Sequence, residues 1–388
     1  MAKNKKQGFE TRAIHAGQEA DPATGAVMMP IYTSSTFKQE SPGVHKGYDY
    51  SRSGNPTRKA FEECMASLED GIKGYGFSSG VAAISACVEL LEPGDHVIAM
   101  DDLYGGTVRL FNEIKTKSQG ITVTYVDMTD FDNVEKAFTD KTKMIFVETP
   151  TNPLLKIADL EKIANFAKEK KILSVCDNTF ASTYIQKTLN FGIDIVLHSA
   201  TKYLGGHSDL IAGVLVIGKD DKRLLEKMAN IQNSLGPITS TFDSYLILRS
   251  LKTLSLRMER HSNNALLLAN ELINHKKIQN VIYPGLESHP QHQLAKKQMN
   301  GFGGIISIEL SGGLEVSKSF LEKTKIFSLA ESLGGVESLV SVPYEMTHGS
   351  VPAETKEAMG LTKDLVRLSI GIEHADDLYE DIFHSFSK

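Results

Sequence analysis

The sequence predicts an α/β protein with a mainly parallel sheet, helices on both faces of that sheet, and a smaller α+β domain. Three observations support this prediction. Between residues 72 and 218, short apolar and β-branched runs alternate with segments of helical periodicity. A chain of 388 residues is too long for one small core. After Gly236-Pro237, a long helical segment leads to a second set of strands and helices.

The first fifty residues are predicted to form an extended arm. They contain Pro22, Pro30 and Pro42 together with many Gly and Ser residues. A stretch of this length with little regular structure is unusual in a compact domain unless it packs on a partner or builds a site. The predicted division is an arm over 1–50, a sheet domain over 51–239, and a linking helix with a C-terminal domain over 240–388.

The strands of the sheet domain are expected wherever a short run is almost entirely apolar: 96–100, 122–126, 144–148, 173–176, 193–197 and 214–217. Helical periodicity between them predicts helices at 81–91, 107–117, 132–138 and 158–170. A long helix is expected over 240–275. The C-terminal domain is expected to contain strands 281–283, 304–310 and 366–372 and helices 315–324 and 375–386.

Composition excludes several classes of protein. The net charge of −6 is spread along the chain without a basic stripe, so a nucleic-acid partner is not expected. Cys64, Cys87 and Cys176 form no C-x-x-C pair, which predicts free thiols in a reducing compartment and no metal site. No run approaches the roughly 18 apolar residues of a membrane span, and the polar start argues against a secretory signal. A cytoplasmic protein is expected.

Lys202 is the first candidate catalytic residue. It follows an apolar strand and lies in the segment Ser199-Ala200-Thr201-Lys202, ahead of Gly205-Gly206. Loss of water at the end of a buried strand lowers the pKa of an amine toward its neutral, nucleophilic form. Ser199 and Thr201 flank the lysine and can hold a phosphate. This combination suits a Schiff base with pyridoxal phosphate, whereas a surface lysine is the alternative for Lys202 alone.

Asp177 is the second candidate, because it ends the short apolar strand 173–176. Open α/β sheets place their ligands at the carboxyl ends of strands. A pyridoxal phosphate enzyme needs a carboxylate against the pyridine nitrogen. The alternative is a cap or turn, for which Asp177-Asn178-Thr179 is also suitable.

The segment Gly74–Gly80 is expected to be a glycine-rich loop that leads into a helix near Val81 and cradles phosphate with backbone N–H groups. A dinucleotide fingerprint would require a third glycine at position 79, where this chain has serine. A nicotinamide-dependent dehydrogenase is therefore disfavoured. A glycine-rich helix start without a ligand remains open.

Three aromatic or basic residues complete the candidates found from local pattern. Tyr104 follows the strand 96–100, so its ring can stack on a pyridine ring, or it simply packs in the core. Tyr50 and Arg52 lie in a polar, turn-rich segment, 48–58, and can donate to a phosphate. A plain surface loop is the alternative for this segment.

Taken together, these segments resemble the Cys/Met-metabolism family of pyridoxal phosphate enzymes, which includes cystathionine γ-synthases, γ-lyases and β-lyases. The resemblance covers the chain from about Thr11 to its C-terminal helix. It is carried by Tyr50-Ser51-Arg52-Ser53-Gly54-Asn55-Pro56-Thr57, Asp177-Asn178-Thr179, Ser199-Ala200-Thr201-Lys202-Tyr203 and Glu331-Ser332-Leu333-Gly334-Gly335. It implies a fold-type I transferase with a seven-stranded sheet.

The resemblance also implies roles for individual residues. Lys202 binds the cofactor covalently, Asp177 pairs with the pyridine nitrogen, and Tyr104 stacks on the ring and moves protons. Ser79, Gly80, Ser199 and Thr201 hold the phosphate, to which Tyr50 and Arg52 donate from a neighbouring subunit. Arg367 binds the substrate α-carboxylate with help from Asn152 and Ser332, and Glu331 and Arg109 are further substrate-binding candidates. The implied assembly is a homo-oligomer, at least a dimer and normally a tetramer.

Within the family, the sequence favours γ-lyase, then γ-synthase, then β-lyase. Methionine γ-lyases carry a cysteine where this chain has Gly106, and one bacterial class of β-lyases carries tryptophan, which this chain lacks. Glu331 beside Ser332 is the pattern of γ-synthases and γ-lyases. Animal and fungal γ-lyases have a second acid where Ser341 stands, but bacterial members of both activities often have serine.

Overall fold

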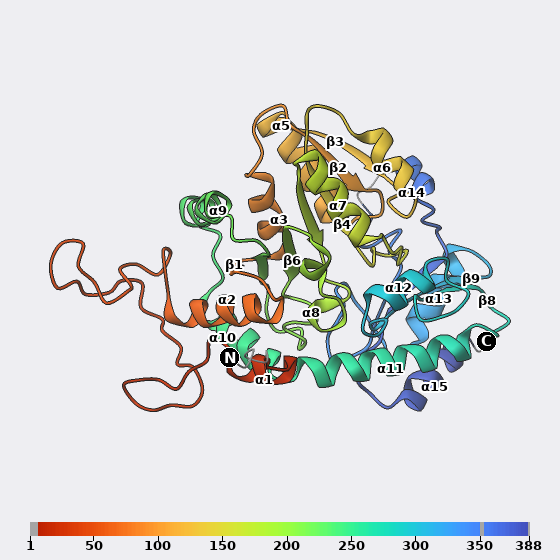
Figure 1. Ribbon diagram of the computed structural model, residues 1–388. Helices are drawn as coiled ribbons and strands as arrows, with labels where there is room; N and C mark the ends of the chain where they lie inside the picture. The colour runs from red at the N-terminus through yellow and green to blue at the C-terminus, as the bar shows by residue number, and fades with distance from the viewer. Residues whose placement is uncertain (1–6, 350–352, 387–388) are drawn as a thin grey trace, which may run out of the picture.

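The computed structural model describes residues 7–349 and 353–386, with a large sheet toward the N-terminal side and a smaller one toward the C-terminal side (Figure 1). The large sheet has seven strands in the order β1-β7-β6-β5-β4-β2-β3. Their bounds are β1 Lys73–Phe77, β2 His96–Met100, β3 Thr122–Val126, β4 Thr142–Glu148, β5 Leu173–Asp177, β6 Ile195–Ser199 and β7 Gly213–Ile217. The five strands β2 to β6 pair in parallel, whereas β7 is antiparallel to both β6 and β1. The predicted mainly parallel sheet is confirmed.

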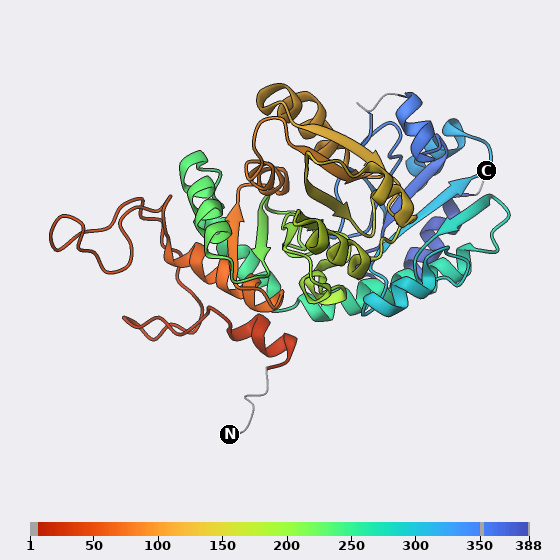
Figure 2. The same cartoon turned by 45° about the horizontal axis from the view of Figure 1, so that its top comes forward.

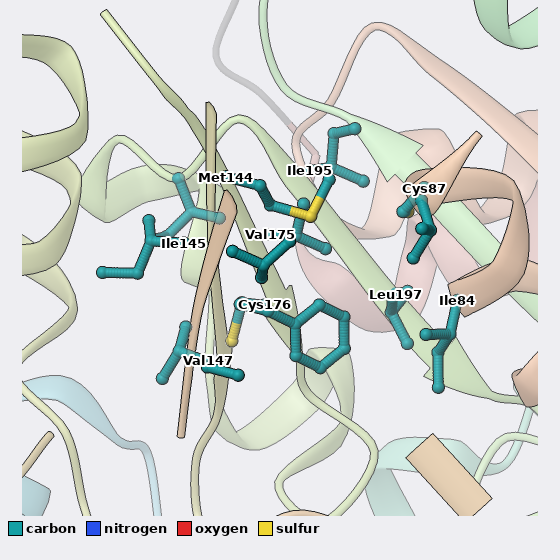
Figure 3. Close-up of a cluster of buried hydrophobic side chains, with 14 of the residues drawn as sticks. Ile84, Cys87, Met144, Ile145, Val147, Val175, Cys176, Ile195 and Leu197 are labelled. Atoms are coloured by element: carbon teal, nitrogen blue, oxygen red, sulfur yellow. The ribbon is translucent and has the colours of Figure 1, made fainter. Parts of the chain in front are cut away.

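Helices cover the sheet as the alternating pattern requires. Figure 3 shows how Ile84 and Cys87, from the helix after β1, face side chains of β4, β5 and β6 such as Met144, Val175 and Leu197. All three of these strand residues are fully buried. Burying such side chains stabilises the fold by about 1.5–3 kcal/mol each, which explains why the strands read as unbroken apolar runs.

The helices around this sheet begin with side-chain caps in several cases, such as Asn55, Ser79, Asp159 and Asp221. Their bounds are α2 Pro56–Leu68, α3 Gly80–Val88, α4 Gly105–Arg109, the π-helical turn η1 Leu110–Lys115, α5 Thr116–Gln119, α6 Phe131–Ala137, α7 Leu160–Lys170, α8 Ser182–Ile185, the 3₁₀ turn η2 Thr188–Phe191 and α9 Lys222–Leu235.

The structure differs from the sequence-based expectations at two places here. The segment 74–80 is a loop only at Ser78-Ser79, because Gly74 and Gly76 belong to strand β1. The turn-rich segment 48–58 runs into helix α2, which the sequence pattern did not reveal. Asn55 caps this helix by accepting hydrogen bonds from the backbone N–H groups of Thr57 and Arg58.

The second sheet has five strands in the order β10-β11-β12-β9-β8. Its elements are β8 Ile278–Ile282, α12 His292–Gln298, β9 Ile305–Leu310, α13 Leu314–Lys323, β10 Ser328–Leu329, β11 Leu339–Ser341, α14 Ala353–Met359, β12 Leu365–Ser369 and α15 Ala375–Ser385. The single helix expected over 240–275 is two helices, α10 Thr241–Leu251 and α11 Leu254–Leu272. Thr253 separates them with a backbone ψ of 8° and a hydroxyl bonded to the carbonyl of Ser250.

The N-terminal segment contains α1 Phe9–His15 and then two long loops that project away from the rest of the chain (Figures 1 and 2). The domain boundaries at residues 50 and 239 stay predictions. In residues 7–349 and 353–386, no helix combines the length and the apolar character needed to cross a membrane.

Candidate active site

A cavity of about 250 Å³ lies at the carboxyl ends of β4, β5 and β6, where segment 331–333 and strand β12 close it. The predicted site residues in its wall are Ser79, Gly80, Tyr104, Asn152, Asp177, Ser199, Thr201, Lys202, Glu331, Ser332 and Arg367. The other lining residues are Val81, Ile84, Glu148, Thr179, Phe180, Ile211, Leu333 and Thr347. The topology thus brings together residues that are up to 288 positions apart, from Ser79 to Arg367.

Lys202 reaches the cavity from the turn after β6. Its Nζ lies 2.6 Å from Oγ of Ser332, to which it donates a hydrogen bond. Burial, aided by the positive charge of Arg367, lowers the pKa of the Lys202 amine to about 8, while Glu331 acts in the opposite direction. At pH 7 about a tenth of this amine is therefore neutral and available as a nucleophile or base, far more than for an ordinary lysine.

Arg367 is held in a fixed position for binding a carboxylate. It is 2 % exposed on strand β12. Its guanidinium donates to Oδ1 of Asn152 and to the carbonyl oxygen of Ser332, both at 2.9 Å. Burial lowers its pKa to about 10, so the group still carries its charge at neutral pH. In the part of the chain that the structure describes, no group accepts a hydrogen bond from its buried Nε.

Ser332 contacts both of these cations. Its hydroxyl accepts from Lys202 and its carbonyl accepts from Arg367. Its backbone φ is +93°, which is unusual for a residue other than glycine. Strained backbone of this kind clusters at functional sites, where the surrounding structure holds it in place.

Asp177 ends β5 and is 6 % exposed. Its Oδ1 accepts hydrogen bonds from the backbone N–H of Thr179 at 3.0 Å and from the Thr179 hydroxyl at 2.5 Å. Burial raises the pKa of Asp177, and these two hydrogen bonds partly oppose that effect. A buried carboxylate of this kind favours a cationic partner.

The start of helix α3 and the end of β6 form the predicted phosphate cradle. Ser79 caps α3 by accepting from the backbone N–H of Ala82 at 3.1 Å. A Cβ atom at Gly80 would lie 2.8 Å from Cβ of Ser199, so only glycine lets the helix approach the strand this closely. The Thr201 hydroxyl exchanges hydrogen bonds with the backbone of Ala212 across the turn.

Tyr104 precedes helix α4, and its ring lies against Gly106. A Cβ atom at Gly106 would be 2.4 Å from Cε1 of Tyr104. The backbone N–H of Tyr104 donates to Oε2 of Glu148 at 3.0 Å. Tyr104 as a whole is 38 % exposed and lines the cavity, where its ring can stack on a planar ligand.

Three candidate residues do not line the cavity of their own chain. Arg52 donates to the backbone oxygen and to Oδ1 of Asn233, at 2.5 and 3.1 Å, and lies over the Tyr50 ring at 5.5 Å. Tyr50 is 45 % exposed. Arg109 lies on the exposed side of α4.

Sequence reasoning missed Glu148, Thr179 and Thr347 as lining residues. Glu148 ends a buried apolar strand, the same signal that identified Asp177, and applying that rule to β4 would have found it. Thr179 lies two residues after Asp177 in a capping-type turn. Thr347 reaches the cavity from the C-terminal part of the chain and carries no local signal.

These residues fit pyridoxal phosphate. An amine with a lowered pKa, a buried carboxylate and a glycine-dependent helix start lie around one cavity. They supply the three attachments that the cofactor needs: a nucleophile for its aldehyde, a partner for its pyridine nitrogen and N–H donors for its phosphate. Arg367, which lines the same cavity, adds a guanidinium group suited to a carboxylate.

Comparison with known proteins identifies the family of this chain. The family model described as Cys/Met metabolism PLP-dependent enzyme matches residues 10–387. A cystathionine β-lyase of Coxiella burnetii is 56% identical over 98% of both chains. A cystathionine γ-lyase of Dictyostelium discoideum is 50% identical over 97% of both chains.

Among solved structures, a cystathionine γ-synthase of Xanthomonas oryzae pv. oryzae, in complex with aminoacrylate and cysteine, matches with a TM-score of 0.95. It is 42% identical and covers 98% of each chain. The predicted fold-type I architecture and the predicted cofactor are confirmed. This chain belongs to the Cys/Met metabolism family of enzymes that depend on pyridoxal phosphate.

Proposed function

We propose that this enzyme is a cystathionine γ-lyase, which converts L-cystathionine and water to cysteine, 2-oxobutyrate and ammonia. The observation that carries the proposal is the pair of opposite charges at the cavity. Arg367 is suited to the α-carboxylate of an amino acid, and Glu331 lines the same cavity. Cystathionine carries an ammonium group at its far end, which a carboxylate such as Glu331 can bind.

Pyridoxal phosphate, when bound, supplies an aldehyde that condenses with an amine and a protonated pyridine ring that withdraws electrons from the substrate α-carbon. Lys202 would hold the aldehyde and Asp177 the ring nitrogen. Ser79, Gly80, Ser199 and Thr201 would hold the phosphate. We further propose that Tyr50 and Arg52 donate to the phosphate bound by a neighbouring subunit.

The chain's own groups provide the remaining steps. Arg367 and Asn152 orient the substrate through its α-carboxylate, so that the α-proton faces the Lys202 amine. The pKa of about 8 suits this amine to accept that proton near neutral pH. Tyr104, at the mouth of the cavity, would exchange a proton with the departing sulfur.

Cystathionine β-lyase is the second candidate, because the Coxiella burnetii relative that carries this name is 56% identical to the chain. It would yield homocysteine, pyruvate and ammonia from cystathionine and water. γ-Synthase chemistry uses the same groups but adds cysteine to an activated homoserine. The relatives carry all three names, so the identity of the product decides among them.

The deciding experiment supplies L-cystathionine to the purified holoenzyme and identifies the keto acid. We expect 2-oxobutyrate as the main product. Pyruvate would establish β-cleavage instead. Formation of cystathionine from an activated homoserine and cysteine, at a higher kcat/KM than either cleavage, would establish a synthase.

Glu331→Ala tests the role of the distal carboxylate. We expect kcat/KM for cystathionine to fall about fivefold, because Glu331 is exposed and an ion pair at such a position contributes about 1 kcal/mol. Exchange of the α-proton of L-alanine, which is too short to reach Glu331, should hardly change. Glu315→Ala, at an exposed carboxylate of α13, is the matched control. Equal losses on both substrates would assign Glu331 a structural role in the turn before Gly334-Gly335.

We also propose that the enzyme is a cytoplasmic homo-oligomer, in agreement with the resemblance to a family of tetramers. Cys64, Cys87 and Cys176 are buried free thiols, as expected of a protein from a reducing compartment.

A further inference from the structure

Glu148 is a buried acid of the cavity wall to which no role has yet been given. It is the last residue of β4 and is 4 % exposed. In the parallel pairing of β4 with β5, Glu148 lies opposite Asp177. On its other side β4 pairs with β2, which leads into the segment with Tyr104, and β4 itself leads into the turn with Asn152.

The Glu148 carboxylate binds the backbone of both segments. Its Oε2 accepts the N–H of Tyr104 at 3.0 Å, and a hydrogen bond from the Asn152 backbone also acts on the group. These hydrogen bonds fix the backbone positions from which the two side chains extend. The Tyr104 ring lies against Gly106, and Oδ1 of Asn152 accepts from Arg367 at 2.9 Å.

The charge of Glu148 has no evident use at this place. In the part of the chain that the structure describes, no ion pair joins a cation to it. Its charged neighbours are the acids Asp177 and Asp102, which together with burial raise the pKa of Glu148 well above its ordinary value. A second negative charge here would also compete with Asp177 for a cationic partner.

We propose that Glu148 is a positioning residue that sets the geometry of Tyr104 and Asn152 through its carboxyl oxygens, and that it does so as a hydrogen-bond acceptor rather than as a charge. The stacking tyrosine and the carboxylate clamp are thereby fixed relative to each other by one side chain. An error of about 1 Å in such a contact costs up to about a hundredfold in rate, so the effect on turnover is measurable.

Three variants separate position from charge. Glu148→Gln keeps an acceptor oxygen at the same distance from the backbone but cannot ionise. Glu148→Asp keeps an ionisable carboxyl group but withdraws its oxygens by one methylene. Glu148→Ala removes both the acceptor oxygens and the ionisable group. Asp381→Ala is the matched control, because Asp381 of α15 is also buried and accepts three backbone N–H groups, from Lys325, Ile326 and Phe327, away from the cavity.

Two readouts are measured on holoenzyme and normalised to bound cofactor. The first is exchange of the α-proton of L-alanine, which does not depend on which C–S bond the enzyme cleaves. The second is the circular dichroism of the cofactor absorbance band, which reports the geometry around the ring without turnover. Thermal unfolding identifies variants that are merely unstable.

We expect Glu148→Gln to stay within about threefold of the wild-type exchange rate with an unchanged dichroic band. Glu148→Asp and Glu148→Ala should lose about ten- to a hundredfold in rate and show an altered band. Asp381→Ala should lose stability but keep both signals per bound cofactor. If Glu148→Gln is as impaired as Glu148→Ala, or if Glu148→Asp matches the wild type, the proposal is wrong.

Discussion

At the scale of single residues, the site depends on side chains whose ordinary ionisation is shifted by burial. Lys202 is the clearest case, because it lies between two groups of opposite effect: Arg367 favours the neutral amine and Glu331 favours the charged one. The net pKa of about 8 lies below the ordinary value of 10.5, so desolvation and Arg367 dominate.

This shift predicts the pH dependence of reconstitution. The rate at which the apoenzyme attaches pyridoxal phosphate should rise with pH up to about 8 and then level off, because only the neutral Lys202 amine attacks the aldehyde. Stopped-flow absorbance over a pH series checks this. An ordinary lysine would give a rate that still rises well above pH 9.

Lys202→Ala should bind the cofactor without covalent attachment and should have no turnover.

Gly80→Ala tests the close approach of α3 to β6. The added Cβ would lie 2.8 Å from Cβ of Ser199, so the helix start must move away from the strand. We expect the affinity for pyridoxal phosphate to fall about five- to a hundredfold, because displacing the helix start by overpacking of this kind costs about 1–3 kcal/mol. Equilibrium titration with the cofactor measures the loss, and an unchanged dissociation constant would remove Gly80 from the cradle.

At the scale of elements, the turn after β4 is held by a second buried acid. Asp102 is fully buried, and its Oδ2 accepts from the hydroxyl of Thr151 and, at 3.0 Å, from the backbone N–H of Leu154. These two residues enclose Asn152. Burial raises the pKa of Asp102 to about 7, despite the two hydrogen bonds.

The raised pKa of Asp102 makes the free energy of unfolding depend on pH. The folded-state pKa lies above the unfolded value, so the stability that Asp102 contributes is complete below about pH 4 and is lost as the pH rises through about 7. Asp102→Asn keeps the acceptor oxygen and cannot ionise. We expect its free energy of unfolding, relative to wild type, to increase between about pH 5.5 and pH 8 by on the order of a few kcal/mol.

Denaturant unfolding of both proteins across this pH range measures the difference. Asp102→Asn also changes the free energy of unfolding by an amount that does not depend on pH, for example because its amide group lacks a partner. This amount is the same at pH 5.5 and at pH 8, so it does not alter the change in the stability difference between them. Parallel stability curves for wild type and Asp102→Asn would show that Asp102 stays charged in the folded protein.

At the scale of the whole molecule, the proposal that Tyr50 and Arg52 serve a neighbouring subunit can be tested by mixing two inactive variants. Both residues lie outside the cavity of their own chain, and Arg52 instead contacts Asn233 of α9. If they serve a neighbouring site, Arg52→Ala and Lys202→Ala subunits, each inactive or nearly so, should regain activity when refolded together. A hybrid dimer has one site in which both residues are intact.

Native mass spectrometry must confirm that hybrids form. In a random mixture of equal amounts, about half of the dimers are hybrids, and each hybrid has one complete site, so recovery should approach about a quarter of the wild-type rate. Verified hybrids that stay inactive would place both residues in the site of their own chain.

The sequence by itself determined the fold class and the cofactor. Apolar runs alternating with helical segments are local properties, and burial on both faces of a parallel sheet requires them. Lys202 and Asp177 were predicted for the same reason, since Asp177 ends β5, Lys202 lies three residues after β6, and the carboxyl ends of parallel strands meet at one edge.

Only the tertiary structure decided the features that depend on contacts between distant segments. Strand β1 looked like a loop because it contains Gly74 and Gly76, yet a Cβ at Gly74 would lie 2.3 Å from the carbonyl oxygen of Glu62 in α2. Packing against a helix, and not strand propensity, selects those glycines. The contact of Arg367 with Asn152 spans 215 residues, and the hydrogen bond from Tyr104 to Glu148 spans 44. Such contacts carry no local pattern, because the fold alone brings their partners within hydrogen-bonding distance.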